Sequence, residues 1–226
     1  MAAGEGTAMN KRIEGPPTDR ELGLSPKPSP RYKLAALDLI SPQRGMAPPV
    51  CEIAKDHWQT PSWIIGLLSG VGKLKLDPCS ADGNPTSADV FYTLRNPAPP
   101  PSEWPACNGS DFCFVNWPYS SNSEWSESVI EYASATGSNV VALAPTSTGT
   151  RWFSCLSKIS TRTILLDKRV QFFDPVAMEI RRANTLGSAI FVIGSDEFCN
   201  GVSKVFKNHG TVFVSVENVA NVEDLR

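Results

Sequence analysis

The sequence is poor in the residues that build metal sites and disulfide frameworks. Its 226 residues include only two histidines, and the six cysteines are scattered without a Cys-x-x-Cys pair. A structural zinc site needs thiol or imidazole ligands clustered at short spacing. We therefore expect no bound metal and cysteines that stay reduced.

Long apolar runs are also missing. No stretch approaches the roughly 20 apolar residues that span a bilayer, and the first residues, MAAGEGTAMNKRIEGPP, lack the apolar centre of a signal peptide. Lysine and arginine total 21 against 23 for aspartate and glutamate, so the overall charge indicates neither a nucleic acid nor a membrane surface as partner. These features predict a cytoplasmic protein with no membrane partner, in which any basic surface is local.

Composition divides the chain into two parts. Residues 1–50 are rich in proline and contain few large apolar side chains, so they cannot offset the entropy of ordering. We expect them to be a disordered arm, and we expect residues 51–226 to form a single domain around one core. A second proline-rich stretch, residues 97–105, interrupts this domain and is predicted to be a surface loop.

Within the domain, helical and strand-like patterns alternate. The patterns predict helices at 62–69, 124–135 and 151–159, and strands at 73–76, 112–115, 139–144, 163–166, 169–173, 189–193 and 211–216. This alternation is typical of an α/β fold with a mostly parallel sheet and helices on both faces. Ligands bind such sheets at the carboxyl ends of the strands. Two loops with a polar, chemically specific composition follow predicted strands there, residues 77–84 and residues 116–121.

The second loop opens with Asn116-Trp117-Pro118-Tyr119. An exocyclic adenine amine is a poor nucleophile because its lone pair is delocalised into the ring, and two acceptors aimed at its hydrogens draw the nitrogen towards tetrahedral geometry. The side-chain oxygen of Asn116 and the carbonyl of Trp117, restrained by Pro118, supply such a pair. Tyr119 would stack on a base swung out of its duplex. An ordinary Asn-x-Pro turn is the alternative interpretation of the same residues.

Three motifs follow one another along the domain. They are Asp56-His57-Trp58-Gln59-Thr60-Pro61, Leu76-Asp77-Pro78-Cys79-Ser80-Ala81-Asp82-Gly83-Asn84 and Asn116-Trp117-Pro118-Tyr119-Ser120. In this order they resemble the signatures of the phage-type DNA N6-adenine methyltransferases. Segments 140–153 and 169–173 extend the resemblance, which covers residues 55–195.

The resemblance implies a Rossmann-like methyltransferase domain that uses S-adenosylmethionine as its cofactor. Carried over by motif, the catalytic residues are Asn116, Trp117, Pro118 and Tyr119, and the cofactor-binding residues are Thr60, Pro61, Asp77, Pro78, Cys79, Ser80, Asp82 and Asn84. The helix amino terminus at Thr60-Pro61 suits the carboxylate of the cofactor. Loop 77–84 would wrap around the rest of it.

Two residues depart from the family pattern. Trp117 stands where the family has proline, which removes one restraint on the carbonyl that should accept the second hydrogen bond. Ala81 stands where related cofactor loops often have glycine, so the loop tolerates less backbone strain. The resemblance therefore leaves open whether the chain is fully active.

The implied partner is double-stranded DNA with a flipped adenine, and contact with DNA requires local basicity. Between residues 151 and 182, seven basic residues outnumber three acidic ones. This excess is compatible with binding to phosphates, and the candidate contacts are Arg151, Lys168, Arg169, Arg181 and Arg182.

Three functions remain open from the sequence. The first is site-specific transfer of a methyl group to adenine N6 in DNA. The second is methylation of an amide or amine in protein or RNA, because the same pair of acceptors suits a glutamine side chain. The third is a catalytically silent relative that only binds DNA. The recognition sequence, the strand preference and the oligomeric state are not encoded in any motif.

Overall fold

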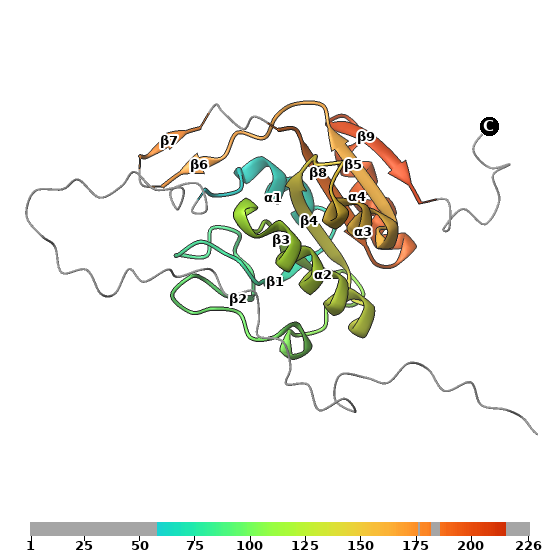
Figure 1. Cartoon of the computed structure of the whole chain (residues 1–226), viewed down its shortest axis with the longest axis horizontal. Coiled ribbons are helices and arrows are strands. Elements are labelled where there is room, and N and C mark those ends of the chain that lie inside the picture. The colour runs from blue at the N-terminus through green and yellow to red at the C-terminus, as the bar shows by residue number, and fades with distance from the viewer. Residues whose placement is uncertain (1–57, 176, 182–185, 216–226) are drawn as a thin grey trace, which may run out of the picture.

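The computed structural model of the chain describes residues 58–175, 177–181 and 186–215. The predicted disordered arm, residues 1–50, lies outside the described residues. The described part forms a mixed α/β fold in which one seven-stranded sheet is covered by helices on both faces (Figure 1). The predicted fold class is confirmed.

The sheet combines a parallel half with an antiparallel half. Its strands are β1 (Lys73–Asp77), β2 (Val90–Phe91), β3 (Asp111–Val115), β4 (Val140–Pro145), β5 (Arg162–Leu166), β8 (Ser188–Ile193) and β9 (Gly210–Val214), and they lie in the order β2-β1-β3-β4-β8-β5-β9. The pairs among β2, β1, β3 and β4 are parallel, whereas β8 is antiparallel to both β4 and β5, and β9 is antiparallel to β5. Five strands therefore run in one direction, and their carboxyl ends share one edge of the sheet.

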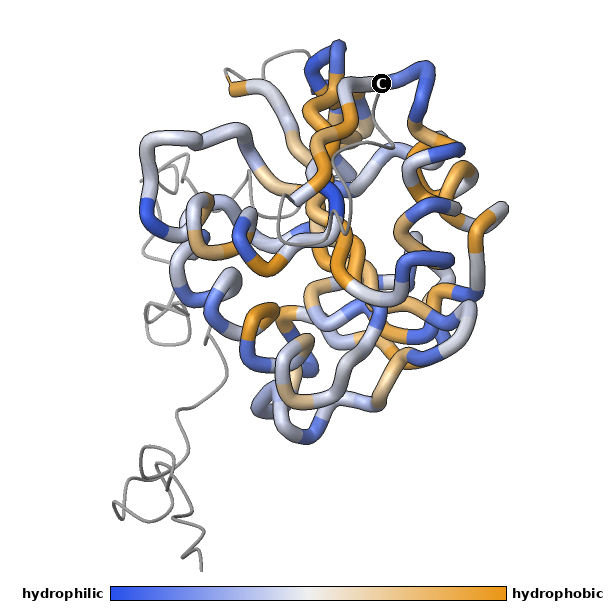
Figure 2. The backbone as a smooth tube through the Cα atoms, turned by 90° about the vertical axis from the view of Figure 1, so that its right-hand side faces the viewer, coloured by the Kyte–Doolittle hydropathy of each residue, from blue (hydrophilic) through white to orange (hydrophobic). Residues whose placement is uncertain are grey.

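Two pairs of helices bury the two faces of the sheet. Helices α1 (Ser62–Ser69) and α4 (Asp196–Phe206) cover one face, and α2 (Asn122–Thr136) and α3 (Arg151–Ile159) cover the other. Figure 2 shows the hydrophobic segments gathered in the strands between these layers. Among the described helices, none has the length and apolar character required to cross a membrane.

Alternation along the strands explains the two-sided core. In β3, Phe112 and Phe114 point towards α1 and α4, whereas Cys113 and Val115 belong to the cluster under α2 and α3. Successive side chains of a strand point to opposite faces, and a strand covered on both sides needs apolar residues at every position. The residues of β4 are accordingly all buried.

The sequence placed most elements correctly. Helices α1 and α3 have the predicted bounds, and six of the predicted strands correspond to β1, β3, β4, β5, β8 and β9. The strand predicted at 169–173 is wrong: residues 169–172 belong to no strand, and only Phe173 enters β6 (Phe173–Asp174), which forms a small hairpin with β7 (Glu179–Ile180). Val170 and Phe172 face the core, which explains the strand-like alternation of the segment.

Two further features differ from the prediction. Helix α4 was not predicted, although its Phe198, Val202 and Phe206 are buried at helical spacing. The proline-rich stretch 97–105 is not simply a surface loop. It contains the short 3-10 helix η3 (Pro101–Glu103), and it delivers Trp104 into the core beside Trp125 and Tyr132.

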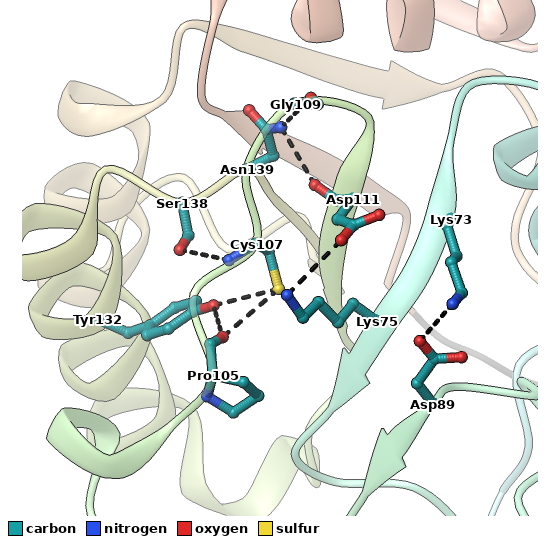
Figure 3. Close-up of polar contacts among 10 residues, drawn as sticks. All are labelled: Lys73, Lys75, Asp89, Pro105, Cys107, Gly109, Asp111, Tyr132, Ser138 and Asn139. Atoms are coloured by element: carbon teal, nitrogen blue, oxygen red, sulfur yellow. Dashed lines mark hydrogen bonds and ion pairs between the residues drawn. The ribbon is translucent and has the colours of Figure 1, made fainter.

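A polar network closes the edge of the sheet at which the parallel strands begin (Figure 3). The buried Asn139 side chain donates to the carbonyls of Gly109 and Asp111 and accepts from the backbone N–H of Ser195. Nearby, Tyr132 donates to the carbonyl of Pro105. These bonds tie the connections before β3, β4 and α4 together, and the carboxyl ends of the parallel strands lie at the opposite edge.

Candidate active site

A cavity of about 400 Å³ opens at the carboxyl ends of β1 and β3. From β1 the chain passes to β2 on one side and later returns to β3 on the other side. Such a reversal of strand order leaves a crevice in which ligands of open α/β sheets bind. The cavity is lined by Trp58, Gln59, Thr60, Asp77, Cys79, Ser80, Ala81, Asp82, Pro85, Thr86, Leu94, Arg95, Phe114, Asn116 and Pro175.

Asn116 lies at this cavity because it is the first residue after β3. Its Nδ2 donates a hydrogen bond of 2.9 Å to Oγ1 of Thr60. Its Oδ1 accepts no hydrogen bond from any of the described residues. The side chain therefore presents a carbonyl oxygen that is available to a donor on a ligand.

The residues after Asn116 form a rigid turn. The backbone N–H of Ser121 donates to the carbonyl of Pro118, and Asn122 Nδ2 donates to the carbonyl of Tyr119 at 2.7 Å. In the described part of the chain, the carbonyl of Trp117 receives no such bond. The carbonyl of Trp117 is therefore a second available acceptor, in the residue that directly follows Asn116.

The loop after β1 is fixed by its own side chains. Thr86 Oγ1 donates to Asp77 Oδ2 at 2.7 Å, and the backbone N–H of Cys79 donates to Asp77 Oδ1 at 3.1 Å. Asn84 pairs with both the N–H and the carbonyl of Ala88. Gly83 and Asn84 adopt positive φ angles of 83° and 52°, which glycine and asparagine tolerate better than other residues. The loop therefore keeps its shape without a ligand.

Burial raises the pKa of two ionisable groups in this loop. Burial raises the pKa of the Asp77 carboxyl to about 6, against the hydrogen bonds from Thr86 and Cys79, which lower it. Burial also raises the pKa of the Cys79 thiol, and the adjacent Asp77 raises it further. Cys79 is therefore a neutral thiol. Both Asp77 oxygens are occupied by donors of the protein, so Asp77 stabilises the loop.

Two buried polar atoms at the cavity lack partners. Trp58 Nε1 has no hydrogen-bond partner among the described residues, and Ser80 Oγ makes no well-formed bond although it lies near enough to lower the pKa of Asp77 slightly. Buried polar groups are normally paired. With its volume, which lies in the range of small-molecule sites, and its mixture of polar and apolar residues, the cavity fits a nucleoside-sized ligand such as S-adenosylmethionine.

Comparison with known families agrees with this geometry. The model of the family described as DNA N-6-adenine-methyltransferase (Dam) matches residues 50–212, which include the whole cavity and all strands of the large sheet except the end of β9. The chain belongs to this family. No curated protein gives a significant match to the chain.

The predicted site residues of this Dam-family chain divide into two groups. Those that line the cavity are Thr60, Asp77, Cys79, Ser80, Asp82 and Asn116, and those that do not line it are Pro61, Pro78, Asn84, Trp117, Pro118 and Tyr119. Sequence reasoning did not assign a role to Trp58, Gln59, Thr86, Leu94, Arg95, Phe114 or Pro175. Trp58 and Gln59 belong to the first motif, so the sequence could have identified them as site residues. No pattern marks the others, because folding alone brings them to the cavity.

Tyr119 is more deeply involved in the core than the sequence indicates. Its ring meets the buried ring of Phe172 edge to face, with 6.1 Å between centroids, and it packs against both core clusters. Burial raises the pKa of its hydroxyl, which Ser188 lowers only in part. The residue remains partly exposed.

The predicted DNA-contacting residues are not equivalent. Arg151, which begins α3, and Lys168 and Arg169, which follow β5, are exposed at the cavity edge of the sheet and form no ion pair within the described residues. Arg181 binds Asp174 and Glu179 on its own hairpin. Arg182 lies outside the described residues. Within the described ranges, no group of three or more His, Cys, Asp or Glu side chains is placed to hold a metal ion.

Proposed function

We propose that the chain is a site-specific DNA methyltransferase that uses S-adenosylmethionine to methylate adenine N6. The observation that carries the proposal is Asn116, whose free Oδ1 borders a cavity at the strand-order reversal of the sheet. The description of the family, DNA N-6-adenine-methyltransferase, indicates DNA as the substrate and adenine N6 as the atom that is methylated. The cofactor is supported by the unpaired polar atoms of Trp58 and Ser80 and by the size of the cavity.

Asn116 and the turn after it act on the target amine. Asn116 Oδ1 and the carbonyl of Trp117 accept its two hydrogens, which draws the nitrogen lone pair out of the ring. Preorganised acceptors of this kind stabilise charge that develops on the nitrogen during transfer. The amine becomes acidic once methylated, so no strong general base is required. Tyr119, which is partly exposed, is the residue that we propose for stacking on the flipped base.

The cofactor would lie against Trp58, Thr60, Ser80 and Asp82, with the fixed loop 77–86 as one wall. When bound, S-adenosylmethionine supplies an electrophilic methyl group. Trp58 Nε1 and Ser80 Oγ would donate to its polar groups, which would satisfy two buried atoms that make no well-formed hydrogen bond within the described residues.

The test is incorporation of label from methyl-labelled S-adenosylmethionine into DNA, RNA and protein. We expect label in DNA, at adenine N6. Asn116→Ala should lower the rate by about 100-fold or more, as the loss of a preorganised catalytic hydrogen bond does elsewhere, while calorimetry shows unchanged cofactor binding. Asn200→Ala, which removes an exposed amide on α4, is the matched control and should be as active as the wild type.

Each alternative gives a different result. Label in RNA or protein instead of DNA assigns the second function, and no incorporation despite DNA binding assigns the silent relative. A folded Asn116→Ala protein that methylates adenine at the wild-type rate would exclude the proposed mechanism.

A further inference from the structure

Thr60 and Asn116 are 56 residues apart in sequence, yet their side chains are hydrogen-bonded at 2.9 Å. Both residues line the cavity. Thr60 lies two residues before the start of α1, and its hydroxyl does not cap that helix: the N-cap position belongs to Pro61, and no side-chain oxygen caps the helix. The hydroxyl of Thr60 is committed to Asn116.

The backbone that carries Thr60 is held on both sides. Gln59 exchanges two backbone hydrogen bonds with Phe173, of 2.8 and 3.1 Å. On the other side the Pro61 carbonyl accepts from the N–H of Ile64 in the first turn of α1. The hydroxyl therefore has a defined position relative to the end of β3.

A primary amide is chemically two-ended, because one end donates and the other accepts. The terminal torsion of asparagine is roughly two-fold, so the two ends exchange places easily unless a partner fixes them. If the NH2 end faced the adenine amine, two donors would oppose each other. Methyl transfer by the proposed mechanism needs the oxygen end in that place.

Resting on the proposed function, we infer that Thr60 is a positioning residue that supports the productive orientation of the Asn116 amide by accepting a hydrogen bond from its NH2 end. Its Oγ1 accepts from Nδ2, which leaves Oδ1 directed away from this bond and available to the target amine. Thr60 thus acts through Asn116, in addition to forming part of the cavity wall.

The first experiment compares Thr60→Val, which keeps the shape and removes the hydroxyl, with Thr60→Ser, which keeps the hydroxyl. We expect Thr60→Val to lower kcat for methyl transfer to DNA by about 3- to 10-fold, the range that the loss of one net hydrogen bond allows. The Kd for S-adenosylmethionine should change little, because valine keeps the shape of the cavity wall and the hydroxyl that it lacks is bonded to Asn116. Thr60→Ser should retain most of the rate. Thr60→Ala is a second variant without the hydroxyl, and melting curves confirm that each protein is folded.

The second experiment repeats Thr60→Val in an Asn116→Asp background. An ionised carboxylate presents an acceptor in either orientation, so it does not need to be oriented. We expect Thr60→Val to have little further effect on kcat in this background. A purely structural role of Thr60 would instead lower kcat equally in both backgrounds.

The outcomes separate the inference from the function on which it rests. A wild-type protein that transfers no methyl group to adenine overturns the proposed function and the inference with it. An active wild type overturns the inference alone if folded Thr60→Val has the same kcat, or if only its Kd for S-adenosylmethionine increases. The latter result would mean that the hydroxyl of Thr60 binds the cofactor and does not position Asn116.

Discussion

Asp77 shows how a single residue at the cavity sets a pH dependence. Its carboxyl is buried at the end of β1, and its pKa is raised from 3.8 to about 6. Between these values the folded chain binds a proton that the unfolded chain does not bind, so the contribution of Asp77 to stability decreases as pH rises. This contribution is complete below pH 3.8 and is lost above about pH 6.

Asp77→Asn should remove this dependence. The amide keeps an acceptor for the Cys79 N–H, and its NH2 can donate to the Thr86 hydroxyl. From pH 4 to pH 7 the free energy of unfolding of the wild type, relative to Asp77→Asn, should fall by on the order of 3 kcal/mol. Thermal melts across this range measure the difference. Thr86→Val removes a bond that lowers the pKa of Asp77, so it should extend the decrease to higher pH; a difference that is constant with pH would contradict the assignment.

Among individual residues, those that belong to motifs were predicted as site residues. Those that lie outside any motif and reach the cavity only through folding were missed. Asn116 and Thr60 were identified as site residues, but their hydrogen bond was not predictable because nothing in the sequence relates positions 56 residues apart. Thr86 and Arg95 were missed for the same reason. Both reach the cavity through the path of the β1–β2 connection and the loop after β2.

The turn from Asn116 to Asn122 contains Trp117, one of the two residues that the motif resemblance marks as departures from the family pattern. From the sequence alone, Trp117 is the loss of a proline restraint, and Trp117→Pro would be expected to preserve or raise the rate. The structure provides another restraint. Trp117 is buried against Trp152, and its Nε1 donates to Asn122 Oδ1 at 2.8 Å. Asn122 in turn binds the carbonyl of Tyr119.

Trp117→Pro should therefore destabilise the protein. Removing a buried indole costs about 3–5 kcal/mol, which the gain in backbone rigidity does not offset. Trp117→Phe keeps an aromatic ring and removes only the N–H, so it should cost about 1 kcal/mol and lower kcat without altering the Kd for the cofactor. Chemical denaturation and steady-state kinetics distinguish the two. A stable and faster Trp117→Pro variant would show that the indole is not part of the restraint.

Elements with strong local patterns were predictable, and elements formed by tertiary contacts were not. Helices α1 and α3 have clear boundaries in the sequence, and both were placed correctly. Helix α4 contains Gly201 and two β-branched valines, which weaken its helical pattern. A Cβ at Gly201 would lie 2.9 Å from Val71 Cγ1, so the glycine serves the packing of α4 against the end of α1. The two-residue strands β2 and β7 are too short to produce a pattern.

The whole molecule has a hydrogen-bonded edge, at which the parallel strands begin, and an open edge, at which they end. At the hydrogen-bonded edge, Asn139 and its partners tie the connections between strands together, beside a recess of about 840 Å³. At the open edge lie the cavity and a second recess of about 510 Å³, which Lys168 and Arg169 line together with Trp63 and His209. Trp63 is 41% exposed and stacks on His209 with 5.2 Å between ring centroids. Cations beside an exposed aromatic ring suit a nucleic acid.

If DNA lies along the open edge, charges there should control its affinity and charges elsewhere should not. The double variant Lys168→Ala/Arg169→Ala should raise the KM for DNA while leaving kcat nearly unchanged, because phosphate contacts hold the substrate without taking part in methyl transfer. Each lost phosphate contact should also reduce the slope of log K against log salt concentration by about 1, hence by about 2 for the pair. Lys158→Ala is the matched control, since Lys158 is exposed near the end of α3, which returns to the edge where β5 begins. Equal salt slopes for the double variant and the wild type would place the DNA on another surface.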